Sequence, residues 1–153
     1  MKKFLSILVL CAVSLSAMAQ LAPSGVQLLN NPGDGSLTVR STASGRTRSI
    51  AMQNAQKQAV RAIVFQGVNV PGNVSLSKPL VMDMNGQTKY EEFFDAFFAD
   101  GGYYKSFVSL QDKKGGSSYR RDSKTQVTLQ ATVRVFRADL KKYLIENNVI
   151  QKQ

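Results

Sequence analysis

The feature that most restricts the fold is a long alternating segment near the C-terminus, TQVTLQATVRVFR, at residues 125–137. Its apolar residues, from Val127 to Val135, alternate without a break with polar residues. Successive side chains of a strand point to opposite faces, so the pattern predicts a strand with one dry face and one wet face. Such a strand is typical of an antiparallel sheet that other elements cover on one side only.

A second pattern, KYEEFFDAFFADGGYYKSF at residues 89–107, holds eight of the chain's thirteen aromatic residues. Thr88 and Glu91 have the spacing of a capping box, which predicts where a helix begins. We expect the aromatic stripe of this helix to pack as core on the dry face of the alternating strand, since each buried aromatic contributes about 2–3 kcal/mol. An open cavity here, serving a small-molecule carrier, is an alternative. The stripe has the spacing of one helix face and consists of Tyr90, Phe93, Phe94, Phe97 and Phe98.

Shorter patterns predict the elements that precede the aromatic helix. Alternation over residues 37–40 predicts a short strand. Ser49 is expected to cap a helix over residues 50–65, whose alanines recur every three or four residues and allow close packing. Residues 67–87 are broken by prolines and glycines, so we expect an irregular segment with a brief strand at 80–82.

Three further elements are predicted after the aromatic helix. Residues 103–110 are expected to form a strand, and a basic connection over residues 112–122 joins it to the alternating strand as a hairpin. Asp139 is expected to start a last helix, which ends at Asn147 and Asn148. Together the elements predict an α+β fold, a two-layer sandwich in which helices cover one face of a small, mainly antiparallel sheet.

The N-terminus, MKKFLSILVLCAVSLSAMAQ, has the basic start, apolar run and small-residue motif of a secretory signal peptide, with cleavage expected before Gln20. The apolar run is too short to span a bilayer, and no later segment is apolar enough to do so. Cys11 follows Leu10 rather than a small residue, which disfavours a lipoprotein signal. The predicted location is periplasmic or secreted, with envelope association as an alternative. The expected organisation is a signal peptide at 1–19, an arm or linker at 20–35, a single domain at 36–150 and a tail at 151–153.

The residue types of the mature chain restrict its chemistry. Removal of residues 1–19 leaves 134 residues with no cysteine and no histidine. Serine–histidine–aspartate and cysteine–histidine catalysis and the usual zinc and copper sites are therefore excluded. Glu91, Glu92 and Asp95 are oxygen ligands of the kind that calcium takes, but we interpret them as charges that favour a helix start and solubility. We expect no catalytic residue, no cofactor and no metal site.

The charge is strongly positive, and loss of Lys2 and Lys3 with the signal peptide lowers the formal net charge from +10 to +8. A basic loop attracts polyanions by counterion release, and a helix start flanked by arginines can hold an anion. A solvated, solubilising face is the more usual role of such charges. The candidate anion-binding residues are Arg46 and Arg48 before the first helix, and Lys113, Lys114, Arg120 and Arg121 in the basic connection.

Three segments carry a resemblance to a known group: AMQNAQKQAVRAIVFQGV, GGYYKSFVSL and TQVTLQATVRVFRADLKKYL. In this order, after a first strand, they resemble the N-terminal domain of the flagellar assembly protein FlgT and the small envelope lipoproteins of the LPP-twenty type. The resemblance covers about residues 36–147 and implies a non-enzymatic module of envelope assemblies, with no catalytic residues. The chain departs from this group in its single domain, its lack of a convincing lipobox and its segment 67–87, which does not align.

These observations lead to one main hypothesis for function. We expect a secreted or periplasmic, non-catalytic accessory or scaffold module that binds other envelope proteins through an exposed sheet surface or an edge strand. The alternative is a binder of anionic surface polymer, such as lipopolysaccharide, acidic glycan or extracellular DNA, through the basic loops. The oligomeric state is left open.

Overall fold

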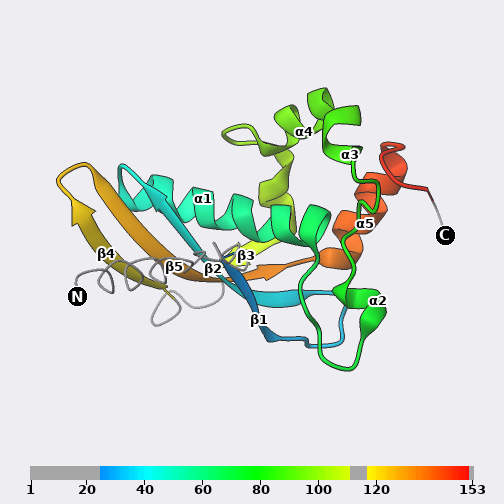
Figure 1. The fold of residues 1–153 in the computed structure, drawn as a ribbon, viewed down its shortest axis with the longest axis horizontal. Coiled ribbons are helices and arrows are strands. Elements are labelled where there is room, and N and C mark those ends of the chain that lie inside the picture. The colour runs from blue at the N-terminus through cyan, green and yellow to red at the C-terminus, as the bar shows by residue number, and fades with distance from the viewer. Residues whose placement is uncertain (1–24, 111–116, 152–153) are drawn as a thin grey trace, which may run out of the picture.

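The computed structural model of the chain describes residues 25–110 and 117–151 (Figure 1). Within them the fold is α+β, as predicted: a five-stranded antiparallel sheet carries the long helix α1 (Arg48–Arg61) along one face. Figure 1 shows the other helices gathered beyond α1 and toward its C-terminal end. The predicted signal peptide lies outside the described residues.

Strand β5 (Gln126–Val135) is the centre of the sheet. On one side it pairs with β2 (Leu37–Gly45), which in turn pairs with the edge strand β1 (Val26–Asn30). On its other side it pairs with two strands in succession, β3 (Val108–Leu110) and β4 (Ser117–Ser123). Within the described chain, β1 is thus one edge of the sheet, and β3 and β4 together form the opposite edge.

The alternation of β5 produces the expected two faces. Its apolar positions are all buried, whereas the polar positions between them are exposed or half-buried. The element that covers the dry face is α1, whose Ala51, Ala55 and Ala59 are fully buried. Small side chains let the helix approach so closely that a Cβ atom added at Gly45 would lie 2.6 Å from the Ala51 nitrogen.

Two details of α1 differ from the prediction. The cap is Thr47 rather than Ser49, because the Thr47 hydroxyl accepts a hydrogen bond from the Ile50 amide at 3.2 Å. The helix then continues as a π-helical segment, η1 (Ala62–Gln66), and ends at Gly67, which has a φ of +78°.

The aromatic stripe lies on helix α4 (Glu91–Phe98), and its buried members are Phe94, Phe97 and Phe98. The expected packing partner was wrong, because α1 and not α4 covers β5. The stripe packs instead against η1, α5 (Arg137–Glu146) and a 3₁₀ segment, η2 (Tyr103–Phe107). Sheet and stripe still belong to one continuous buried cluster.

The predicted capping box does not form. Thr88 lies inside a separate short helix, α3 (Gly86–Lys89), and the residue before α4 is Tyr90, which makes no side-chain cap hydrogen bond. The amide of Tyr90 instead bonds the Gly86 carbonyl at 3.2 Å. Helix α4 therefore begins directly after the last turn of α3, without a side-chain cap.

Two segments expected to lack structure contain strands. Residues 26–30, assigned to an arm or linker, form β1, because a turn containing Gly33 (φ +81°) and Gly35 (φ +85°) folds the chain back onto β2. Residues 117–122, assigned to a basic connection, belong to β4. β4 has no apolar alternation because it is an edge strand, exposed at nearly every position.

Several other elements differ from the prediction in their type or in their first and last residues. Residues 103–107 form η2 rather than a strand, because Tyr104 and Phe107 are buried at the three-residue spacing of a 3₁₀ turn. The expected strand at 80–82 is absent, but Leu80 and Val81 donate backbone hydrogen bonds to the π-helical segment at 3.2 and 2.9 Å. A short helix, α2 (Val74–Ser77), precedes them. Helix α5 begins two residues before Asp139 and ends as predicted, with Asn148 at φ +57°.

Candidate functional site

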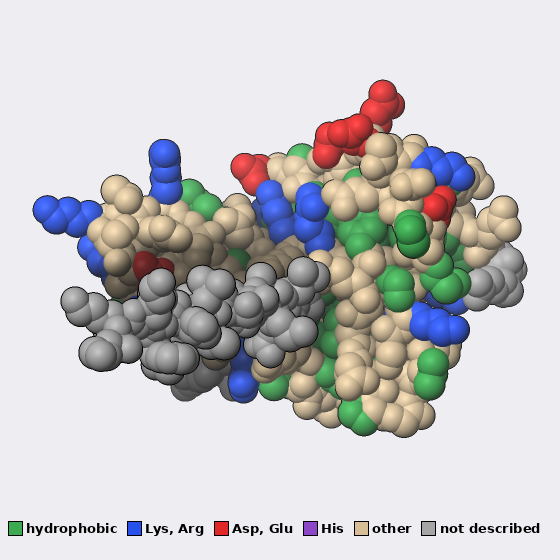
Figure 2. Space-filling view, viewed as in Figure 1, with side chains coloured by type: hydrophobic (Ala, Val, Ile, Leu, Met, Phe, Trp, Pro, Cys, Tyr) green, Lys and Arg blue, Asp and Glu red, His purple; other side chains and the backbone are tan. Residues whose placement is uncertain are grey.

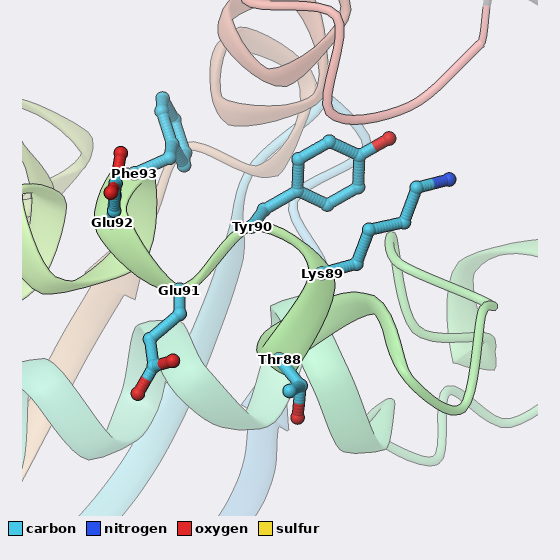
Figure 3. A pocket seen from close by; sticks show the side chains of 6 residues that line it. All are labelled: Thr88, Lys89, Tyr90, Glu91, Glu92 and Phe93. Atoms are coloured by element: carbon cyan, nitrogen blue, oxygen red, sulfur yellow. The ribbon is translucent and has the colours of Figure 1, made fainter.

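A shallow depression of about 430 Å³ lies at the junction of α3 and α4 (Figure 3). It is lined by six consecutive residues, from Thr88 to Phe93. Figure 3 shows the side chains of Glu91 and Glu92 pointing to different sides, so these two carboxylates do not converge on one point. Over residues 25–110 and 117–151, no group of three or more histidine, cysteine or acidic residues is arranged to hold a metal ion. The depression lacks the convergent polar groups of a ligand site.

The candidate anion-binding residues are divided between two faces of the sheet. Arg120 and Arg121 lie in β4 rather than in a loop, and neighbouring strand residues point to opposite faces. Arg120 lies level with Thr128 on the wet face, where its Nε donates to Asp122 Oδ1 at 2.8 Å. Arg121 lies level with Val127, on the face that α1 covers.

Of the other candidate arginines, Arg48 contacts β4 on the side that faces α1. Arg48 is the first residue of α1, and its guanidinium carbon lies 4.7 Å from the centre of the Tyr119 ring. Arg46 lies in the turn between β2 and α1, next to Gly45, which is level with Val127. Lys113 and Lys114 lie outside the described residues. The sequence did not single out Tyr119 as a partner for Arg48, because the two residues are 71 positions apart and meet only through the packing of α1 on the sheet.

The charges of the described chain are unevenly distributed. Figure 2 shows basic side chains at the end of the molecule that carries the β4–β5 hairpin; the helical part carries a group of acidic side chains and further basic ones. On the wet face of the hairpin, hydrogen bonds from Thr128 and then Arg120 lower the pKa of the Asp122 carboxyl. The Asp122 carboxylate therefore lies on the wet face and pairs there with Arg120 rather than with the arginines on the helix side.

The edge strand β1 is a second candidate site, because of its backbone. The Thr42 amide donates to the Gly25 carbonyl at 2.9 Å, so Gly25 directs its backbone groups toward β2. Since successive residues of a strand direct these groups to opposite sides, Val26 and Leu28 direct theirs outward. Leu29 adds an apolar side chain that is 42% exposed. No residue from 26 to 30 is charged.

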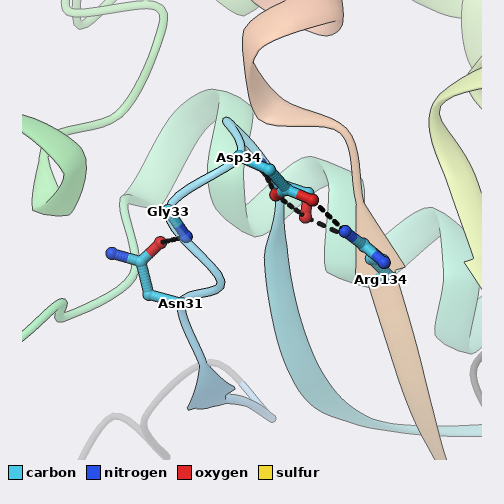
Figure 4. Close-up of polar contacts among 5 residues, drawn as sticks. Asn31, Gly33, Asp34 and Arg134 are labelled. Carbon is cyan, nitrogen blue, oxygen red and sulfur yellow. Dashed lines mark hydrogen bonds and ion pairs between the residues drawn. The ribbon is translucent and has the colours of Figure 1, made fainter.

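A polar cluster fastens the turn after β1 to the centre of the sheet (Figure 4). Arg134 of β5 forms an ion pair with Asp34, and its Nε donates to the Ser36 hydroxyl at 2.8 Å. The Ser36 hydroxyl and amide donate to Asp34 Oδ1 at 2.6 and 3.0 Å. These hydrogen bonds from Ser36, with the charge of Arg134, lower the pKa of the Asp34 carboxyl. Asn31 further stabilises the turn by accepting the Gly33 amide at 3.2 Å.

Comparisons with protein-family models, curated proteins and solved structures found no match to this chain. The resemblance to the FlgT N-terminal domain and the LPP-twenty lipoproteins therefore stays a prediction. Among the helices of the described residues, none combines the length and apolar character needed to cross a bilayer.

Proposed function

We propose that the protein is a non-catalytic accessory or scaffold module of the cell envelope that binds an extended segment of another protein at the outer edge of β1. The observation that carries the proposal is the contrast between the two sheet edges. The edge opposite β1 is formed by β3, which is three residues long, and by β4, which carries three charged residues in its seven; shortness and charge both protect an edge, whereas β1 has five residues and no charge. Within the described chain, no strand pairs with the outer edge of β1.

The geometry of β1 suits strand addition. An added strand would bond the outward backbone groups of Val26 and Leu28, which gives affinity without requiring a particular partner sequence. The template is rigid, because Val26 is 6% exposed within the core and the Asp34–Ser36–Arg134 cluster holds the following turn. Leu29 offers an apolar contact beside the backbone edge.

The location and the absence of catalysis are parts of the same proposal. The signal-peptide pattern of residues 1–19 supports export, and the mature chain lacks the histidine and cysteine that most hydrolytic and redox sites use. An exported domain with a receptive edge and no catalytic group is suited to assembling with other envelope proteins.

The test compares edge variants of the mature protein in native envelope extracts. Leu29→Lys places a charge at the β1 edge, and Ser118→Lys places the same charge on β4 as the matched control. We expect co-purification with mass spectrometry to recover a discrete partner with the wild type and Ser118→Lys, but not with Leu29→Lys. A monomer that captures nothing after mild extraction and crosslinking, or equal capture by all three proteins, would overturn the proposal.

Hydrogen exchange then locates the contact. In the free protein the outward amides of Val26 and Leu28 are expected to exchange quickly, because they make no bond to β2. Binding of the purified partner should slow exchange at these two amides and leave β4 unchanged. Protection confined to β4 or to the helices would exclude strand addition at β1.

A further inference from the structure

The end of the molecule that carries the β4–β5 hairpin and the start of α1 has a surface that strand addition at β1 does not use. We define it as the basic end; its members are Arg46, Arg48, Tyr119, Arg121 and Lys124. All five are exposed, and Tyr119 is 59% exposed. They come from the turn before α1, from the first residue of α1, from β4 and from the turn of the β4–β5 hairpin.

Strand register brings these segments together. Gly45, Val127 and Arg121 lie abreast on three adjacent strands, so the turn that carries Arg46 begins level with Arg121, with β5 between them. Tyr119 and Arg121 are two residues apart on one strand and therefore share a face. The Arg48 guanidinium, 4.7 Å from the Tyr119 ring centre, links α1 to that face.

Among the described residues, no carboxylate forms an ion pair with a cation of the basic end. The ion pairs of the described residues join other groups, and none includes Arg46, Arg48, Arg121 or Lys124. Asp122, the acidic residue of β4, bonds Arg120 and Thr128 on the opposite face. Four cations at one end of a protein with a positive net charge form a field that attracts anions.

We propose that the basic end binds an anionic polysaccharide. Arginine is the side chain best suited to it, because the planar guanidinium pairs bidentately with carboxylate, sulfate or phosphate groups. The exposed part of Tyr119 supplies a surface against which a sugar ring packs. A single-stranded nucleic acid fits less well, because its sites use several aromatic rings for successive bases and this surface has one.

Binding of heparin, as a sulfated polysaccharide probe, tests the proposal across a range of salt concentrations. The variant Arg46→Gln/Arg48→Gln/Arg121→Gln removes three charges from the basic end. The matched control, Arg40→Gln/Lys78→Gln/Lys105→Gln, removes three exposed charges elsewhere. We expect the first to weaken heparin binding at least about tenfold and to reduce the log–log salt slope by about 2–3, and the control to change affinity less than about threefold.

Two further arms distinguish a polysaccharide site from a nucleic-acid site and from a general effect of net charge. Tyr119→Ala is expected to weaken heparin binding while leaving the salt slope unchanged, because it removes no charge. Single-stranded DNA of matched charge is expected to bind more weakly than heparin.

Two results would overturn the proposal. Equal losses of heparin affinity in the two triple variants would show that only net charge matters. Tighter binding of the DNA than of heparin would assign the surface to nucleic acid. Circular dichroism confirms that each variant is folded. The variants do not alter β1, so strand addition is tested separately.

Discussion

Phe97 offers the sharpest test of whether the aromatic corner is sealed core, because it lies at the centre of the cluster. Its side chain is 1% exposed, and five rings lie around it with centroids 4.9 to 6.5 Å away: Phe93, Phe94, Phe98, Phe107 and Tyr143. Phe97→Ala removes the whole ring from a place where helices from three parts of the chain meet. The neighbours cannot all collapse into the space, so a cavity term adds to the lost burial.

The expected cost is about 3–5 kcal/mol of the free energy of unfolding, the range for a buried phenylalanine replaced by alanine. That is a large share of the roughly 5–15 kcal/mol that stabilises a domain of this size. For a domain of about 120 residues, it corresponds to a fall of roughly 10–20 °C in Tm. Urea unfolding followed by circular dichroism measures the free energy, and the slope m should stay unchanged.

The matched control is Tyr103→Ala, from the same aromatic segment. Tyr103 is 66% exposed and meets one ring, that of Tyr143, at 5.9 Å. We expect it to cost less than about 1 kcal/mol, as surface substitutions usually do. If Phe97→Ala costs no more than Tyr103→Ala, the corner is an open cavity rather than core, and the small-molecule carrier returns as the better hypothesis.

Two more predictions concern stability. Gly67→Ala and Gly72→Ala each force alanine to a positive φ, +78° and +76°, which side chains other than glycine rarely adopt and which costs about 1–3 kcal/mol. At Gly67 the new Cβ would also lie 2.2 Å from the Ser77 carbonyl oxygen, whereas nothing lies within 4 Å at Gly72; urea unfolding should therefore show a clearly larger loss for Gly67→Ala, and equal losses would contradict the packing of α2 against this turn. The second concerns Asp34, whose pKa is lowered in the folded state, chiefly by hydrogen bonds from Ser36. Its contribution to stability is complete above the unfolded pKa, near 4, and is lost as the pH falls through the folded value; Asp34→Asn should thus flatten the decline in Tm below pH 4, and an unchanged acid profile would exclude the role of this carboxylate.

Sequence by itself determined the elements whose signal is local and periodic. The unbroken alternation of residues 127–135 predicts both the central strand and its dry face, because the period of two follows from strand geometry alone. The alanines of α1 and the aromatic residues of α4 likewise predict which helix face is buried. These patterns were sufficient for the α+β class.

Partner choice was decided by the tertiary structure. A stripe shows that a helix face is buried but not what it is buried against, so α1 and not α4 proved to cover β5. The edge strands β1 and β4 were missed, because an edge strand needs little apolar alternation. The candidate arginines show the same limit. Arg120 and Arg121 point to opposite faces of β4, and the packing of α1 on β2 and β5 brings Arg48 to the Tyr119 ring. Such meetings depend on strand register between distant segments, which no local pattern encodes.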